Sequence, residues 1–196
     1  MAKAPPNADR ILVAALDLAE EDGWDALRLR RVADRLGVAP AKVRRHFRDK
    51  DAIADAWLAR ADAAMLRPRS RSFFRRPPPQ RLHGVICDWL DALAPHRRVT
   101  AEMLGEKLYP GHPHHNIGLV LRLSRTVQWV RDAAGLDAGG RRKKIEEIGL
   151  SALFVATLAR WARDQTPDQE MTRAFLATRL RHADQALSYL SPRSRA

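Results

Sequence analysis

The stretch from Arg28 to Lys50 constrains the fold of this chain most strongly, because its pattern predicts two helices joined by a very short turn. Four apolar residues follow the i, i+3, i+4, i+7 spacing of one buried helical face: Leu29, Val32, Ala33 and Leu36. Gly37 comes next and is the residue best able to adopt the left-handed conformation that ends a helix. Pro40 suits the first position of a second helix, whose buried face carries Val43 and Phe47. Two helices connected in this way form a helix-turn-helix.

The second helix of this motif leaves a basic set of side chains exposed. They are Ala41, Lys42, Arg44, Arg45, His46 and Arg48. Across the whole stretch there are nine Lys or Arg and two Asp. Because the second helix of such a motif enters the DNA major groove, this charge suits a polyphosphate partner. The alternative is a solvated basic face on an ordinary helical hairpin.

From about Asp9 to Trp57 the sequence resembles the N-terminal DNA-binding domain of the tetracycline-repressor (TetR) family of bacterial transcriptional regulators. The matching elements are ILVAALDLAEEDGWDAL, LRLRRVADRLGV, the recognition helix PAKVRRHF, and RDKDAI at the start of a fourth helix. The resemblance implies binding to double-stranded DNA, and Lys50 matches a family lysine that touches DNA phosphate. The expected DNA-binding residues are Arg28, Arg30, Ala39, Pro40, Ala41, Lys42, Arg44, Arg45, His46 and Lys50.

Three residues depart from the family pattern. The family usually places Ser or Thr at the N-caps of the second and recognition helices, where this chain has Arg28 (or Leu27) and Ala39. Loss of each capping oxygen costs a helix ~1 kcal/mol. Arg44 stands where the family usually has a phosphate-contacting Tyr. Arginine also binds phosphate, so we expect operator preference to change more than affinity.

The composition narrows the class of protein. A formal net charge of +12 favours nucleic acid or an anionic membrane surface as partner. The single cysteine, Cys87, excludes an intrachain disulfide framework, and its helical surroundings indicate a buried structural thiol. We expect no signal peptide, because the start MAKAPPNADR lacks a long apolar core, and no apolar run is long enough to span a membrane. The sequence therefore predicts a soluble cytoplasmic protein without a membrane span.

The helical patterns predict an all-α fold with an N-terminal three-helix DNA-binding domain and a C-terminal helical domain. The expected boundaries are 1–66 for the helix-turn-helix domain with its linking helix 50–66, 67–80 for a basic, Pro-rich linker, and 81–191 for a domain that binds an effector and dimerises. The linker is expected to be semi-rigid. Its alternative role is a second contact with DNA phosphate or a membrane, anchored by Phe73 and Phe74.

Aromatic and apolar side chains of the C-terminal helices indicate a ligand cavity. The candidate ligand-binding residues are Trp89, Met103, Leu123, Trp129 and Phe154. Few polar groups accompany them, so a small apolar effector such as a fatty acyl or isoprenoid molecule fits best. A fully packed core without a cavity is the alternative.

The last two helices, expected at about Arg141–Arg163 and Pro167–Leu190, carry more apolar surface than a monomer of this size leaves in water. The sequence therefore predicts a homodimer. Its expected interface residues are Phe154, Leu158, Trp161, Phe175, Leu176, Leu180 and Leu187.

Catalytic and metal-binding patterns are missing. There is no P-loop, dinucleotide-binding glycine fingerprint, H-E-x-x-H or G-x-S-x-G motif. Glu146 and Glu147 are adjacent, so we expect them to point in different directions at a solvated helix end. The histidines of the predicted loop YPGHPHHN (His112, His114 and His115) lack a second spaced ligand group for a metal. We expect a non-enzyme with no cofactor and no metal.

Two functions stay open at this stage. The first is a TetR-like transcriptional regulator, a repressor that binds a pseudo-palindromic operator as a homodimer and is released by a small apolar effector. The second rests on ARWARDQTPDQEMTRAFLATRLRHADQAL, which resembles the C-terminal region of the lipid-binding accessory protein of ubiquinone biosynthesis. That resemblance implies a lipid- or isoprenoid-binding accessory protein with a vestigial helix-turn-helix.

Overall fold

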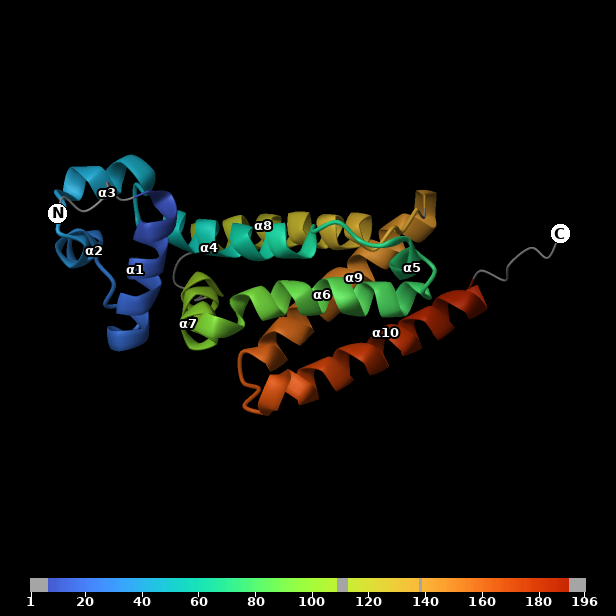
Figure 1. Ribbon diagram of the computed structural model, residues 1–196. Helices are drawn as coiled ribbons and strands as arrows, with labels where there is room; N and C mark the ends of the chain where they lie inside the picture. The colour runs from blue at the N-terminus through green and yellow to red at the C-terminus, as the bar shows by residue number, and fades with distance from the viewer. Residues whose placement is uncertain (1–6, 109–112, 138, 191–196) are drawn as a thin grey trace. The chain divides into compact units, whose positions relative to one another are not determined.

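The computed structural model describes residues 7–108, 113–137 and 139–190, and the regular structure in these ranges is entirely helical (Figure 1). The α-helices are α1 (Ala8–Asp22), α2 (Leu29–Leu36), α3 (Pro40–His46), α4 (Lys50–Met65), α5 (Arg71–Phe74), α6 (Pro78–Leu93), α7 (Arg97–Leu108), α8 (Pro113–Ala133), α9 (Gly140–Trp161) and α10 (Glu170–Leu190). Two 3-10 turns, η1 (Ala94–His96) and η2 (Pro167–Gln169), precede α7 and α10. The predicted all-α class is confirmed.

Local signals place the first four helices. The Asn7 side chain accepts a hydrogen bond from the Arg10 amide at the start of α1, a cap that the sequence analysis missed. Gly23 ends α1 with a φ of 89°, and Gly37 ends α2 as predicted with a φ of 67°. Asp49 caps α4, because its carboxylate accepts a hydrogen bond from the Ala52 amide at 2.8 Å.

The chain forms two compact units that alternate along the sequence. The first comprises residues up to Ala61 together with Leu93–Asn116, and the second comprises Asp62–Ala92 together with the residues from Ile117 onward. Helix α7 therefore belongs to the same unit as the predicted helix-turn-helix. The division into consecutive domains at 1–66, 67–80 and 81–191 stays a prediction.

The core of the first unit is formed by helices α1 through α4 together with α7. Trp24 and Leu27, which follow α1, are both buried in this core. The Trp57 indole, also buried, donates a hydrogen bond to the Thr100 hydroxyl of α7 at 2.8 Å. Since Thr100 is fully buried, this bond satisfies two polar groups that have no access to water.

The core of the second unit is built on tryptophan. The rings of Trp89 and Phe154 meet edge to face with centroids 5.1 Å apart. Trp161 is fully buried and donates to the Gln169 side chain at 2.7 Å, where the side-by-side helices α9 and α10 connect (Figure 1). Cys87 is buried as predicted, and burial raises the pKa of its thiol to about 11, so the unreactive thiol form prevails near neutral pH.

Residues 67–80, the predicted linker, contain the short helix α5 and the first turn of α6. Phe73 is buried under the Arg69 guanidinium, which lies 4.8 Å from its ring centroid, whereas Phe74 is 48% exposed. Within the described ranges, no helix is long and apolar enough to cross a membrane.

Two predicted boundaries need correction. The final helix was expected to begin at Pro167, but α10 begins at Glu170, because Asp168 and Gln169 have positive φ and interrupt the helix. The predicted loop before the eighth helix is shorter than expected, since α8 already begins at Pro113, where proline suits a first helical turn. His112, and the side chains of His114 and His115, lie outside the described residues.

The interpretation of Glu146 and Glu147 was wrong. Both carboxylates reach Arg131 of α8, with Glu147 Oε1 3.0 Å from Nη1 and Glu146 Oε2 3.3 Å from Nη2. The Arg131 side chain is buried, and its two terminal nitrogens lie far enough apart to bind adjacent residues. These glutamates therefore neutralise a buried arginine, and they do not form a solvated helix end.

Candidate functional site

The connection between α2 and α3 is held by backbone hydrogen bonds. The Gly37 amide donates to Asp34 O at 3.1 Å, and the Val38 amide donates to Ala33 O at 3.0 Å. Val43 and Phe47 of the second helix are buried, as predicted. One face of α3 is thus fixed on the core of its unit, and the opposite face is presented to solvent.

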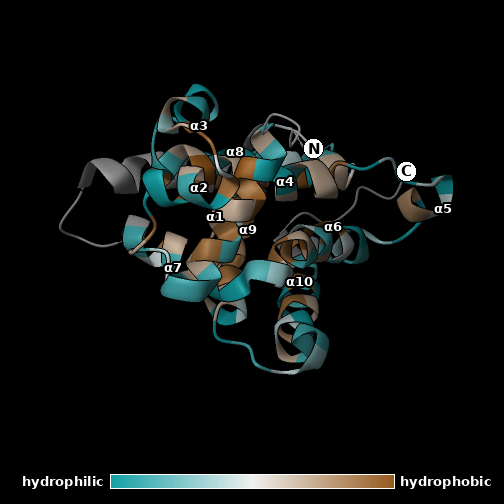
Figure 2. Ribbon diagram, turned by 60° about the vertical axis from the view of Figure 1, so that its left-hand side comes forward, coloured by the Kyte–Doolittle hydropathy of each residue, from teal (hydrophilic) through white to brown (hydrophobic). Residues whose placement is uncertain are grey.

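The exposed face of α3 carries the predicted basic set. Nine of the ten predicted DNA-binding residues are exposed, namely Arg28, Arg30, Ala39, Pro40, Ala41, Lys42, Arg44, Arg45 and His46. Figure 2 shows the predominantly hydrophilic colouring of this helix. Within the described residues, Arg30, Lys42, Arg44 and Arg45 form no ion pair, so their charges are available to an anionic partner.

Other arginines of the motif have structural partners on α1. Arg31 lies 2.7 Å from the Asp22 carboxylate. Arg35 binds Glu21 through two hydrogen bonds of 3.0 and 2.5 Å, and these bonds hold the pKa of Glu21 below its usual value. The basic residues of the motif therefore form two sets. Arg31 and Arg35 connect α2 to α1, whereas Arg30 and the basic residues of α3 face solvent.

Lys50, the tenth predicted contact, is only partly exposed. Its Nζ lies 2.9 Å from Oε2 and 3.0 Å from Oε1 of Glu106 on α7. It also lies 4.0 Å from Asp25 and 5.3 Å from the centre of the Trp24 ring. Glu106 was not predicted as a partner, because it follows Lys50 by 56 residues and belongs to no recognisable motif.

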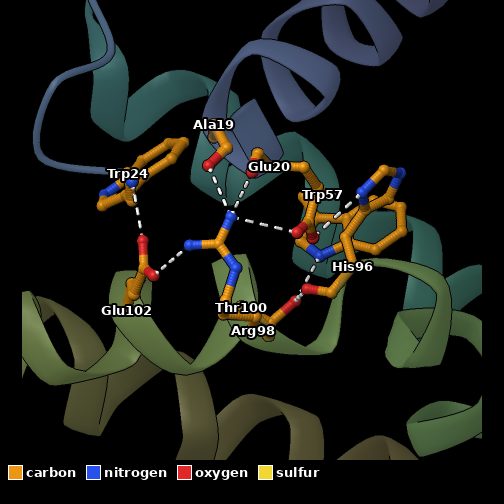
Figure 3. Close-up of polar contacts among 8 residues, drawn as sticks. All are labelled: Ala19, Glu20, Trp24, Trp57, His96, Arg98, Thr100 and Glu102. Carbon is orange, nitrogen blue, oxygen red and sulfur yellow. Dashed lines mark hydrogen bonds and ion pairs between the residues drawn. The ribbon is translucent and has the colours of Figure 1, made fainter. Parts of the chain in front are cut away.

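Helix α7 also binds the end of α1 and the turn that follows it (Figure 3). The Arg98 guanidinium donates to the carbonyl oxygens of Ala19 and Glu20 at 3.1 and 2.5 Å, which satisfies the last turn of α1. Glu102 accepts from the Trp24 amide at 2.7 Å and from Arg98 at 2.6 Å. These bonds fix α7 against the elements that position the helix-turn-helix.

The candidate ligand residues are divided between the two units. Trp89, Leu123 and Phe154 belong to the second unit, and Met103 belongs to the first. Trp129 is 50% exposed, so its side chain does not share the buried environment of Trp89 and Phe154.

A polar group beside Trp89 was not predicted. Asp62 accepts from the Trp89 indole at 2.8 Å and from the Thr126 hydroxyl at 3.3 Å, and Arg122 lies 3.4 Å from its other oxygen. The cluster around Asp62 is therefore an exception to the expectation that few polar groups lie in this region, and the ligand site itself stays a prediction.

The predicted dimer residues are mostly inside the chain's own core. Phe154, Leu158, Trp161, Leu176 and Leu180 are buried, and Phe175 and Leu187 are partly buried. A side chain already covered by its own chain leaves no surface for a second chain. Among the described side chains of α9 and α10, the large apolar ones that are exposed are Ile145, Ile148, Val155 and Met171.

Comparison with known proteins identifies the family. The family described as "Bacterial regulatory proteins, tetR family" matches residues 11–57. A TetR transcriptional regulator from Nitrosomonas europaea, known from its crystal structure, is 40% identical in sequence to this chain. The match covers 91% of this chain and 98% of that regulator, and the two structures superpose with a TM-score of 0.81. The chain belongs to the TetR family.

Further matches agree with this TetR-family assignment. Tetracycline repressor protein class A from transposon 1721 of Escherichia coli is 46% identical over 63 residues, which span 30% of this chain and only 28% of that repressor. A transcriptional regulator from Rhodococcus sp. RHA1 has a TM-score of 0.64 at 19% identity, over 92% of this chain and 97% of its own, and shows the same fold. The COQ9 family matches residues 147–186. The TetR-family chain is thus a transcriptional regulator whose C-terminal helices also resemble COQ9.

Proposed function

We propose that this TetR-family regulator is a repressor that binds a short pseudo-palindromic operator as a homodimer and is released by a small apolar effector. The observation that carries the DNA-binding part is the exposed face of α3. It presents Lys42, Arg44 and Arg45, which form no ion pair with any residue that the structure describes, on a helix that the motif directs toward the major groove. Neither the missing caps nor the absent tyrosine removes this face.

Selection from random duplexes tests the proposal, because a sequence-specific regulator enriches a two-fold related site. Arg45→Ala should cost ~1–3 kcal/mol at one base position if Arg45 reads a base, since arginine binds guanine through two hydrogen bonds. Lys42→Ala should weaken binding to all sequences and reduce the salt slope by ~1 if Lys42 binds phosphate. Arg181→Ala removes an equal charge from the exposed side of α10 and serves as the control.

Enrichment of no sequence from the random pool would exclude specific operator recognition. Equal losses for the Arg181 and Arg45 variants would show that only net charge matters. The cytoplasmic location expected from the sequence is part of this proposal, because the operator lies on the bacterial chromosome.

The homodimer part is supported by the exposed face of α9. Ile145, Ile148 and Val155 are 54%, 72% and 48% exposed, and the small residues Ala152 and Ala159 continue the same stripe. The spacing of three and four residues is that of a helix seam that packs against another helix. A second copy of α9 is the occupant that a two-fold regulator provides.

The effector part is supported by the buried aromatic pair of Trp89 and Phe154 in the core of the second unit. A fatty acyl or isoprenoid chain fits these surroundings, and the cluster around Asp62 adds polar selectivity for a ligand head group. Organic extraction of the purified protein, mass spectrometry, and titration of the recovered lipid against the DNA complex test this part. A ligand that does not weaken DNA binding has no preference between the DNA-bound and the DNA-free conformation, so it is not the effector.

The second candidate, a lipid- or isoprenoid-binding accessory protein with a vestigial helix-turn-helix, is favoured by the COQ9 match over α9 and α10. The two functions make opposite predictions at low salt. A regulator binds duplex DNA with a steep salt dependence. An accessory protein with a vestigial helix-turn-helix binds lipid but does not bind the duplex.

A further inference from the structure

Lys50 is a predicted phosphate contact that is already bound to a carboxylate. Both oxygens of Glu106 lie within 3.0 Å of its Nζ, and the Asp25 carboxylate lies 4.0 Å away. The Trp24 ring, 5.3 Å away, covers another side of the ammonium group. The lysine is therefore held by one close carboxylate, a second more distant one and an aromatic face.

Glu106 is held in place by the rest of α7. Arg98, Glu102 and Glu106 are spaced by four residues, so they lie along one face of the helix. Arg98 binds the last carbonyl groups of α1, and Glu102 binds the amide of Trp24 in the turn that follows. Glu106 is the third member of the same row and reaches the first residue of α4. The Glu106–Lys50 pair thus follows from the way α7 is anchored to its own unit.

The charge around Lys50 is unlike that of the recognition helix. Two carboxylates, from Glu106 and Asp25, face this one ammonium group, whereas Lys42 and Arg45 have no acidic partner in the described part of the chain. A phosphate that approached Lys50 would meet the Glu106 carboxylate beside it, and like charges at such separations repel. A DNA phosphate and the Glu106 carboxylate therefore compete for the single positive charge of Lys50.

We propose that Glu106 competes with DNA phosphate for Lys50 and thereby lowers the affinity of the helix-turn-helix for DNA. The inference rests on the proposed function in taking duplex DNA as the partner, and on the family resemblance in taking Lys50 as a phosphate contact. Because phosphate is present in every sequence, the competition acts equally on operator and non-operator DNA.

Glu106→Gln tests the competition, because glutamine keeps the size and a hydrogen-bond acceptor and removes the negative charge. The full chain is titrated by fluorescence anisotropy with a non-operator duplex of about 20 base pairs at several salt concentrations. The variant should bind roughly fivefold more tightly, and its salt slope should steepen by about 0.9, since one further phosphate is then neutralised.

A double-mutant cycle attributes the gain to Lys50. Lys50→Ala should change the affinity of the original chain less than twofold, because Glu106 already neutralises this lysine, but it should abolish the whole gain of Glu106→Gln. Asp17→Asn removes one negative charge from the exposed side of α1, and any effect it has should be independent of Lys50. Glu106→Ala is the second variant should the glutamine protein fail to fold.

Three results would overturn the inference. They are weaker binding by Glu106→Gln, an unchanged affinity, and a gain that persists without Lys50. If the duplex binds but the cycle shows no coupling, only this inference fails. If random selection enriches no operator while the cycle shows coupling, only specific recognition fails. If neither the original chain nor Glu106→Gln binds any duplex at low salt, both fail together.

Discussion

Asp164 is a buried carboxylate that organises the connection between α9 and α10. It accepts hydrogen bonds from the amide and hydroxyl groups of Thr166 at 2.9 and 2.5 Å, and from those of Thr172 at 2.8 and 2.5 Å. Burial alone raises the pKa of Asp164, but these four bonds together outweigh it and hold the pKa well below its usual value. The ionised form is therefore part of the native fold.

Asp164→Asn should lower the free energy of unfolding by ~1–3 kcal/mol at neutral pH, because an amide nitrogen cannot accept the bonds from Thr172. The native carboxylate stabilises the fold fully above the pKa of an unfolded aspartate, about 4, and this contribution declines as the pH falls below that value. The variant should therefore lose less stability than the original protein between about pH 5 and pH 3. Urea unfolding monitored by circular dichroism at each pH measures both effects.

Asp168→Asn is the matched control, since Asp168 is exposed and its positive φ of 49° is well tolerated by asparagine. It should change stability by less than ~0.5 kcal/mol. An identical pH dependence for the Asp164 variant and the original protein would refute the role of the carboxylate.

At the scale of single elements, α3 is a short helix that lacks a side-chain cap. Ala39 has the extended conformation of an N-cap residue, with φ −64° and ψ 140°, but forms no capping hydrogen bond. Arg28 at the start of α2 also caps nothing with its side chain. The uncapped starts that the sequence predicted are confirmed.

Ala39→Ser should therefore stabilise the protein by ~0.5–1 kcal/mol, because the hydroxyl can accept from a free amide in the first turn of α3. Thermal and urea unfolding measure the gain. Ala41→Ser, inside the first turn, offers no capping geometry and should be neutral or slightly destabilising. Equal effects of the two serines would indicate that capping is not the cause.

Much of the candidate site was predictable at this scale. Gly37 and the apolar face of α2 identified the motif, and the exposed positions of α3 followed from helical periodicity. Which arginines remain available was not predictable. Arg31 and Arg35 look like Arg44 and Arg45 in the sequence, and only the position of α1 shows that the first two are paired.

At the scale of the whole molecule, the apolar stripe on α9 is left uncovered by its own chain. Ile148→Glu should convert the proposed dimer into a monomer at micromolar concentration, because two-fold symmetry places the introduced charge in the interface twice. Sedimentation velocity measures the change. Binding to a two-fold related operator should weaken in parallel.

Val13→Glu is the control for this prediction. Val13 is 42% exposed on α1, so the substitution adds the same charge to another exposed apolar position. It should leave the oligomeric state unchanged. A dimer that survives Ile148→Glu, or a monomeric original protein, would rule out the α9 interface.

The sequence by itself determined the helical class, the helix-turn-helix and the exposed basic face of α3, because helical periodicity and glycine conformation act between residues close in the chain. The tertiary structure alone decided which charges are paired. The partners of Lys50, Asp62 and Arg131 come from other helices, and ionic contacts between distant segments depend on how those helices pack. For the same reason, the apolar residues that α9 exposes could not be separated from those it buries before its packing was known.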